Sequence, residues 1–440
     1  MRIHCLSHNL RLMKKSNVKS MLEKAEFEHR CFHPISNSQR QCVYRYTRAG
    51  SLVRVFPGLY ARTEYWQNLY TAEQIRHIAF SLMDIHPDWK FTGVTAAALI
   101  GYDVVNDYDH ITYDYKTDYK TDKNSDCVKM LPSQSIPIYV RTITRKSAND
   151  NPLLRRINAT GREMDGTSDD VRIVRGREGS GGRFVVLSHL SDNIDYGVRS
   201  HIVDKSTMLF DVANSMNFRS ALSIFDSAAR DNVDFAKVIS ICESRYSTSD
   251  INNYKSVSAA TTSDLFESTF FGSCCETRID KFLSLRRLCC FANRLSENGG
   301  ESFARGTMIS LGFMVPELQR EFILPHSGGK YRCDFLWRLP NAELIVGEFD
   351  GHSKYYVDFD NPSHTNVDFN SSCDNRMLRK SYNPSVINRN IDRQAEREAL
   401  LMKECGVSRI VRFTISDIVN PKRVESKLID AGVPRIIKML

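Results

Sequence analysis

The stretch KYRCDFLWRLPNAELIVGEFDGHSK, from Lys330 to Lys354, contains two apolar runs separated by a short polar turn at 339–342. Runs of this kind are typical of two antiparallel strands joined as a hairpin. Asp334 lies in the first run, and Glu348 and Asp350 lie at the end of the second. A hairpin would bring carboxylates from both strands to one edge of a sheet. Carboxylate oxygens are the ligands that Mg²⁺ and Mn²⁺ prefer, so the stretch predicts a divalent metal site.

The segments around this hairpin predict a mixed domain of helices and strands. The expected elements are a helix over 301–311, strands over 319–324, 331–337 and 343–349, a long helix over 386–405 and a strand over 409–413. This α-β-β-β-α-β order matches the PD-(D/E)XK nuclease core. Three separated motifs, GGESFARGTMISLGF, the hairpin and IDRQAEREALLMKECGVSRIVRFT, resemble small endonuclease-like domains related to the very-short-patch repair nuclease.

That resemblance implies phosphodiester hydrolysis, which needs a divalent ion to polarise the phosphoryl oxygen and to activate water. Asp334 and Glu348 are the expected metal ligands. Glu301 would approach from the first helix as a ligand or as a water-orienting base. Lys354 would stabilise the pentavalent phosphorane or position the water through its ammonium group.

The sequence departs from the standard nuclease motif at one position. The lysine expected two residues after Glu348 is replaced by Asp350. Asp350 either extends the metal site or caps the turn at Gly351, and Lys354 either takes the role of the lysine or is a solvated loop residue. Three polar residues of the long helix either contact DNA or the site or form surface pairs: Gln394, Glu396 and Arg397.

Length and composition indicate a globular protein of two or three domains. The 440 residues are 42% hydrophobic and 25% charged. No run of about 18 apolar residues occurs, and the N-terminus lacks the apolar core of a signal peptide, so we expect a cytosolic protein without a membrane partner. The 12 cysteines show no C-x-x-C spacing, which favours thiols over zinc ligands or disulfides.

Positive charge is concentrated at the N-terminus. Residues 1–62 carry 12 Lys and Arg against 3 Asp and Glu, and the rest of the chain is close to neutral. Such a basic module indicates a polyanionic partner, although a solvated basic face without a partner fits the same charge.

The pattern of residues 16–62 predicts a winged helix-turn-helix. Ser36 or Ser38 caps a helix that ends at Gly50, and LVRVFPGLYAR over 52–62 alternates as a two-stranded wing, with Arg62 on it. The residues expected to reach base edges or phosphates are Gln39, Arg40, Gln41, Arg45, Arg48 and Arg54.

The first half of the chain resembles the AbiEi-family antitoxin-like proteins of bacteria. The wing RVFPGLYAR, the segment GVTAAALIGYDV and the helical stretch 201–230 carry the resemblance. In that family the winged helix binds operator DNA and a second module opposes a nucleotidyltransferase toxin. The expected domains are a winged helix-turn-helix over 1–65, an α+β middle domain over 66–246, a linker over 247–263 and a nuclease-like domain over 264–440.

Together these patterns predict an α/β multidomain protein that binds double-stranded DNA and carries a Mg²⁺- or Mn²⁺-dependent deoxyribonuclease. The resemblances imply a role in phage or mobile-element defence, with a toxin or another defence protein as a further partner. One alternative is an AbiEi-like antitoxin or transcriptional autoregulator with an inactive nuclease fold. Another is a nickase or repair endonuclease that acts at mismatches.

Overall fold

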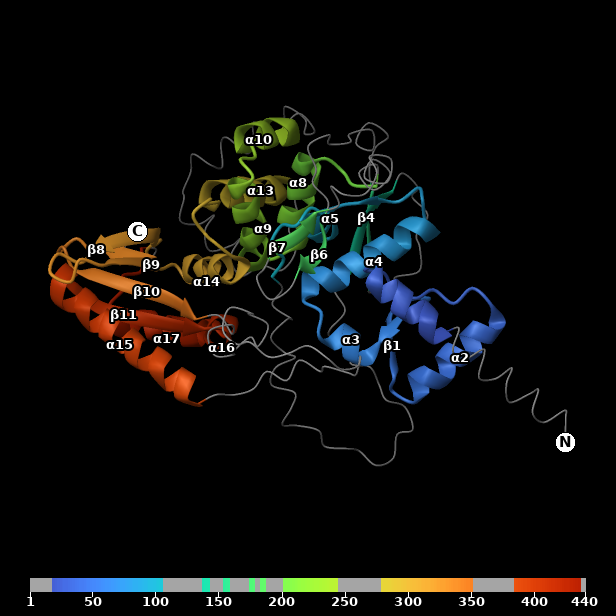
Figure 1. Cartoon of the computed structure of the whole chain (residues 1–440). Coiled ribbons are helices and arrows are strands. Elements are labelled where there is room, and N and C mark those ends of the chain that lie inside the picture. Colours follow the sequence, from blue (N-terminus) through green and yellow to red (C-terminus); the bar gives the residue numbers. More distant parts are fainter. Residues whose placement is uncertain are drawn as a thin grey trace. The chain divides into compact units, whose positions relative to one another are not determined.

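The structure is a computed structural model (Figure 1). It describes residues 18–105, 137–142, 153–158, 174–178, 183–186, 201–243, 278–350 and 384–436. The chain forms two compact units, Met1–Arg294 and Leu295–Leu440. Helices and sheets occur in both, so the protein is a mixed α/β molecule, as the sequence predicted at that level. Among the described residues, no helix is both long enough and apolar enough to cross a membrane.

The first unit begins with a helix that ends at Phe27, followed by a helix and a hairpin. The elements up to residue 67 are α2 (Asn37–Arg48), β1 (Leu52–Phe56), β2 (Leu59–Arg62) and α3 (Thr63–Gln67). Ser36 begins α2 because its Oγ accepts from the Gln39 N–H at 3.2 Å, while the Gln39 carboxamide accepts from the Ser36 N–H at 3.0 Å. This reciprocal capping box satisfies backbone donors that the helix itself leaves unpaired. Gly58, with φ of 81°, turns the chain between the two antiparallel strands.

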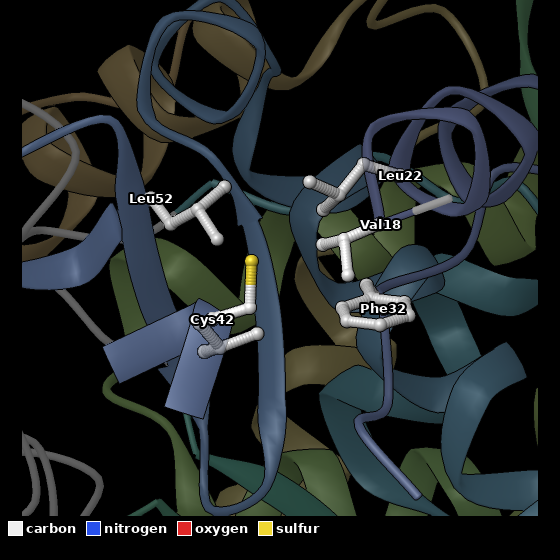
Figure 2. Packing of buried hydrophobic residues seen from close by; sticks show 6 residues of the cluster. Val18, Leu22, Phe32, Cys42 and Leu52 are labelled. Atoms are coloured by element: carbon white, nitrogen blue, oxygen red, sulfur yellow. The ribbon is translucent and has the colours of Figure 1, made fainter. Parts of the chain in front are cut away.

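A small apolar core holds these first elements together. Its buried members come from the first helix, from α2, from β1 and from the segment between the helices, and Figure 2 shows five of them labelled: Val18, Leu22, Phe32, Cys42 and Leu52. Val43 completes the buried set. Because the first helix, α2 and β1 all contribute buried side chains, the basic surface of α2 is carried on a packed unit rather than on an isolated helix.

The rest of the first unit combines short strands with a helical layer. Its elements are α4 (Thr71–Ile85), β3 (Lys90–Phe91), α5 (Gly93–Leu99), β4 (Ile138–Thr142), β5 (Leu154–Asn158), β6 (Val174–Glu178), β7 (Arg183–Val186), α8 (Lys205–Ser215), α9 (Phe218–Arg230), α10 (Phe235–Glu243) and α13 (Arg278–Phe291). One sheet has the order β3-β4-β5, and β6 pairs only with β7 among the described strands. Arg141 of β4 and Asp211 of α8 form an almost fully buried ion pair at 2.7 Å.

Helix α13 determines where the first unit ends. It packs against α8 and α9, and the first unit ends after Arg294. The nuclease-like domain predicted from the sequence begins at residue 264. The expected linker over 247–263 lies outside the described residues.

The second unit is built on one four-stranded sheet. Its elements are α14 (Gly299–Ser310), β8 (Glu317–Ile323), β9 (Lys330–Arg338), β10 (Leu344–Asp350), α15 (Pro384–Cys405), β11 (Val407–Thr414), α16 (Ile415–Val419) and α17 (Pro421–Ala431). The strand order is β11-β10-β9-β8, as Figure 1 shows. The pairs β8–β9 and β9–β10 are antiparallel, and β10–β11 is parallel. These elements appear in the predicted order, with ends that differ by a few residues from the expected ones.

Helices α14 and α15 cover opposite faces of this sheet. Leu401 of α15 belongs to the same buried cluster as Val346 of β10. On the other side, a Cβ placed on Gly300 of α14 would collide with the ring of Phe349. Successive side chains of a strand alternate between its faces, so Val346 and Phe349 point to opposite sides. The carboxyl end of β10 therefore lies between two packed layers.

Candidate functional site

The hairpin brings Asp334 and Glu348 to the same end of the ladder between two neighbouring strands. The β9–β10 ladder ends where Gly347 of β10 pairs with Phe335 of β9, so Glu348 and Asp334 are the residues next to its last pair. Beyond the last backbone pair, the Asp334 side chain takes the place of a backbone acceptor, because the Phe349 N–H donates to Asp334 Oδ2 at 2.7 Å. The two expected metal ligands are therefore adjacent positions of one sheet, and the Asp334 carboxylate is held by the backbone of β10.

Gln319 of β8 lies opposite Asp334 on the other side of β9. The β8–β9 pairing is regular before and after Gln319 but omits Gln319 itself. Its φ is 52°, in the left-handed region that non-glycine residues rarely occupy. The Gln319 Nε2 donates to Glu301 Oε2 at 3.0 Å, so an edge of the sheet is tied to α14 at this point. Sequence reasoning did not identify Gln319, because glutamine carries no motif signal at that position.

Glu301 is a buried carboxylate near the beginning of α14. Its Oε2 also accepts from the Glu297 N–H at 2.9 Å, and its Oε1 accepts from Asn298 Nδ2 at 2.5 Å. The pKa of Glu301 is raised to about 7, mainly by burial and in part by the nearby charge of Asp334, while the hydrogen bonds from the Glu297 N–H and Gln319 lower it. A carboxyl with such a pKa exchanges its proton near neutral pH.

Glu348 is buried, and its partners come from the sheet. The Tyr331 hydroxyl donates to Glu348 Oε1 at 2.9 Å, and Arg412 of β11 is its neighbour in the parallel ladder. Burial and the charge of Glu348 raise the pKa of Tyr331, so the phenol remains a hydrogen-bond donor. The guanidinium carbon of Arg397 in α15 lies 5.0 Å from the centre of the Tyr331 ring, which places a second cation near this end of the sheet.

Asp350, which replaces the expected lysine, is bound to an arginine. Arg412 Nη1 donates to Asp350 Oδ2 at 2.6 Å, and Arg412 Nε donates to Glu398 Oε1 of α15 at 2.6 Å. The carboxamide oxygen of Gln394 also reaches this guanidinium when the amide is turned to face it. Arg412 thus places its guanidinium against the residue that stands where the motif has lysine. Sequence reasoning overlooked Arg412 because only the strand register brings it to Glu348.

Two carboxylates, those of Asp334 and Glu348, are the donors at this site that suit Mg²⁺. Within the ranges that the structure describes, no group of three or more His, Cys, Asp or Glu side chains is arranged to hold a metal ion. Mg²⁺ is commonly held by one or two protein carboxylates, with waters and substrate phosphate oxygens as the other ligands. Asp334 and Glu348 fit that chemistry. Asp350, the third carboxylate expected to bind metal, forms an ion pair with Arg412. Lys354 lies outside the described residues.

A second candidate site is the exposed face of α2. The helix contains no acidic residue. Cys42 and Val43 face the core, and the exposed side chains on the opposite face are Arg40, Gln41, Tyr44, Arg45 and Arg48. The Arg48 guanidinium lies 6.0 Å from the centre of the Tyr44 ring. Tyr44, which is 63% exposed, was not among the expected DNA-binding residues although its helical spacing matches theirs.

Three further residues of this N-terminal module have distinct environments. Gln39 closes the capping box of α2, so its carboxamide is used at the helix start. Arg54 of β1 is exposed. Arg62 is the last residue of the wing strand β2 and forms an ion pair with Glu26 of the first helix, and this hydrogen bond raises the pKa of Arg62.

Comparison of the chain with protein-family models, with curated proteins and with solved structures finds no match. The two family resemblances therefore rest on the motifs in the sequence. Two arrangements of side chains bear on function, namely the carboxylates at the end of the hairpin and the basic face of α2.

Proposed function

We propose that this protein is a divalent-metal-dependent deoxyribonuclease that docks on double-stranded DNA through its N-terminal module. The observation that carries the proposal is the placement of Asp334 and Glu348 next to the last pair of the β9–β10 ladder, where the Phe349 N–H donates to Asp334, with Glu301 bound to the neighbouring strand through Gln319. The order of α14, three strands, α15 and a parallel strand supports a PD-(D/E)XK fold for the second unit.

The chain's own residues have separate tasks in such a hydrolysis. A bound Mg²⁺ or Mn²⁺ supplies Lewis acidity at the phosphoryl oxygen and lowers the pKa of water. Asp334 is oriented by the Phe349 N–H and Glu348 by the Tyr331 hydroxyl, so both carboxylates are held in place before substrate arrives. Glu301, whose pKa is raised to about 7, is suited to take the proton of the attacking water.

The N-terminal module supplies the DNA-binding part of the proposal. Its helix, helix and hairpin follow the order of a winged helix-turn-helix, with α2 as the recognition helix. Arginines on the exposed face neutralise phosphates, and Tyr44 adds a ring beside Arg48. The resemblance to AbiEi-like proteins supports a setting in phage or mobile-element defence.

The test is cleavage of supercoiled plasmid in Mg²⁺ or Mn²⁺. Asp334→Asn and Glu348→Gln keep an oxygen that accepts the hydrogen bonds from Phe349 and Tyr331, so they remove the negative charge but keep the size and shape of the side chain. We expect each to slow cleavage by at least about a hundredfold. The control is Glu321→Gln, an exposed carboxylate of β8 whose ion pair with Lys330 spans 3.6 Å. Cleavage that persists in EDTA, or in both site variants, would contradict the proposal.

A second candidate function has its own support. Asp350 stands where the motif has lysine, and its ion pair with Arg412 leaves a carboxylate rather than an ammonium group beside the site. This arrangement favours an AbiEi-like antitoxin or autoregulator whose nuclease fold is inactive and serves as a binding platform. A wild-type protein that binds duplex DNA tightly and never cuts it in Mn²⁺ would decide for this alternative. Nicked rather than linear product would instead indicate the repair-type nickase.

A further inference from the structure

Gln319 has a backbone conformation that its neighbours in the strand do not share. Four described non-glycine residues have positive φ: His29, Asn232, Gln319 and Ala342. Of these only Gln319 lies inside a strand as the structure describes them, and the ladder is regular on both sides of it. A left-handed residue costs free energy and persists where surrounding contacts hold it. A contact at this position must therefore stabilise the left-handed conformation of Gln319 relative to the extended one.

The contact that accompanies this conformation is the hydrogen bond from Gln319 to Glu301. The other two donors to Glu301, the Glu297 N–H and the Asn298 amide, belong to the start of α14 and are explained by helix capping. Gln319 comes from the sheet, and capping does not require it. Its amide joins α14 to the strand β8 that pairs with β9 around Asp334.

We propose that Gln319 is a positioning residue of the nuclease site, whose left-handed backbone and amide hold the Glu301 carboxylate next to Asp334. This inference rests on the proposed function. The charge of Asp334 contributes to the raised pKa of Glu301, which supports their closeness. Two carboxylates repel each other, so without a donor between helix and sheet Glu301 would turn away from Asp334.

Three substitutions of Gln319 separate the effect of its amide hydrogen bond from the effect of its left-handed backbone. Gln319→Gly removes the amide but adopts positive φ without strain, so we expect its melting temperature to equal or exceed that of the wild type. Gln319→Glu keeps the size of the side chain, and its ionised carboxylate cannot donate to Glu301. Gln319→Asn tolerates the left-handed region and keeps a shorter amide, so it should restore part of the activity. Glu321→Gln on the same strand is the matched control.

The measurements are the single-turnover cleavage rate, the Kd for a labelled duplex, the melting temperature and the affinity for Mn²⁺ alone by calorimetry. Gln319→Gly and Gln319→Glu should cleave at least about tenfold more slowly, with the Kd for DNA within about twofold of the wild type. A residue that served stability alone would lower the melting temperature instead. Cleavage by both variants within about twofold of the wild-type rate would overturn the inference while leaving the proposed nuclease intact.

The Mn²⁺ titration decides the case in which the wild type does not cut DNA. The proposed function then fails, and the inference about Gln319 is judged on metal affinity. An affinity at least about fivefold weaker in Gln319→Gly than in the wild type and the Glu321→Gln control would retain it. Equal affinities, or no Mn²⁺ binding by the wild type, would overturn it.

Discussion

Each carboxylate of the C-terminal site has a different partner, and the partner determines what that carboxylate is suited to do. Asp334 accepts from a backbone N–H, Glu348 accepts from a phenol, and Asp350 is paired with Arg412. Backbone and phenol donors orient a carboxylate without cancelling its charge, whereas a guanidinium neutralises it. Asp334 and Glu348 are thus better placed than Asp350 to bind a cation.

Glu301 provides a pH-dependent test at the residue scale. In the unfolded chain it titrates near the ordinary 4.5, and in the folded protein burial raises its pKa to about 7. Below the lower value Glu301 is protonated in both states. Above the upper one it is charged in both, and the folded state carries the cost of the buried charge. The stability associated with protonated Glu301 is therefore present at low pH and is lost as pH rises through about 7.

Glu301→Gln has no carboxyl to ionise and should escape this loss. Its melting temperature relative to the wild type should rise between pH 4.5 and pH 8, by the equivalent of about 1–3 kcal/mol. Calorimetric melting of both proteins across that range measures the change. The comparison across pH removes any constant offset from altered hydrogen bonds at residue 301. A difference in melting temperature that is the same at every pH would show that Glu301 keeps its ordinary pKa.

At the scale of elements, α2 combines a buried edge with a basic exposed face. Ser36 and Gly50 define its ends, and the apolar core of the first helix and the hairpin holds it. Arg45 and Arg48 are three residues apart, so they lie side by side on the exposed face, and Arg40 lies on the same half of the helix. A basic face of this kind suits the backbone of a duplex, where neutralised phosphates release counterions.

Removing charge from α2 should therefore change the salt dependence of DNA binding. Arg45→Gln and Arg48→Gln should each weaken binding and reduce the slope of log K against log salt by about 1. Fluorescence anisotropy with a labelled duplex at several salt concentrations gives the slope. Lys24→Gln, which removes one exposed charge from the preceding helix, serves as the control. Equal slopes for all four proteins would place the DNA contact elsewhere.

At the scale of the whole molecule, a buried ion pair lies wholly within the first unit. In the first unit, Arg141 donates to both Asp211 oxygens at 2.7 Å, and the Thr92 hydroxyl donates to the same carboxylate at 2.5 Å. The pair joins β4 to α8 across positions far apart in the chain. A buried charge that loses its partner strongly destabilises the fold around it.

Asp211→Asn should therefore destabilise the first unit by about 3–5 kcal/mol. If the two units fold separately, calorimetry will show one transition shifted down and the transition of Leu295–Leu440 unchanged, with Mn²⁺ affinity also unchanged. Glu23→Gln, which breaks only an exposed pair with Lys19, should cost less than about 1 kcal/mol. Transitions that move together would show that the units unfold as one body.

The sequence by itself determined the elements and their order, because the signals for them are local. Ser36 and Gly50 mark a helix by their own backbone chemistry, and Pro57 with Gly58 marks a turn. The apolar runs around 339–342 likewise predict a hairpin, and the hairpin places Asp334 at the same end of the ladder as Glu348. Those two residues are neighbours through one short turn, so the sequence indicated their proximity.

Tertiary structure alone decided which distant side chains join them. Arg412 reaches Asp350 because β11 pairs in parallel with β10 at one register, and Gln319, whose backbone is left-handed, donates to Glu301 from β8. The packing of α13 with α8 and α9 likewise assigns it to the first unit. Register and packing depend on the burial of whole faces, and no local pattern carries that information.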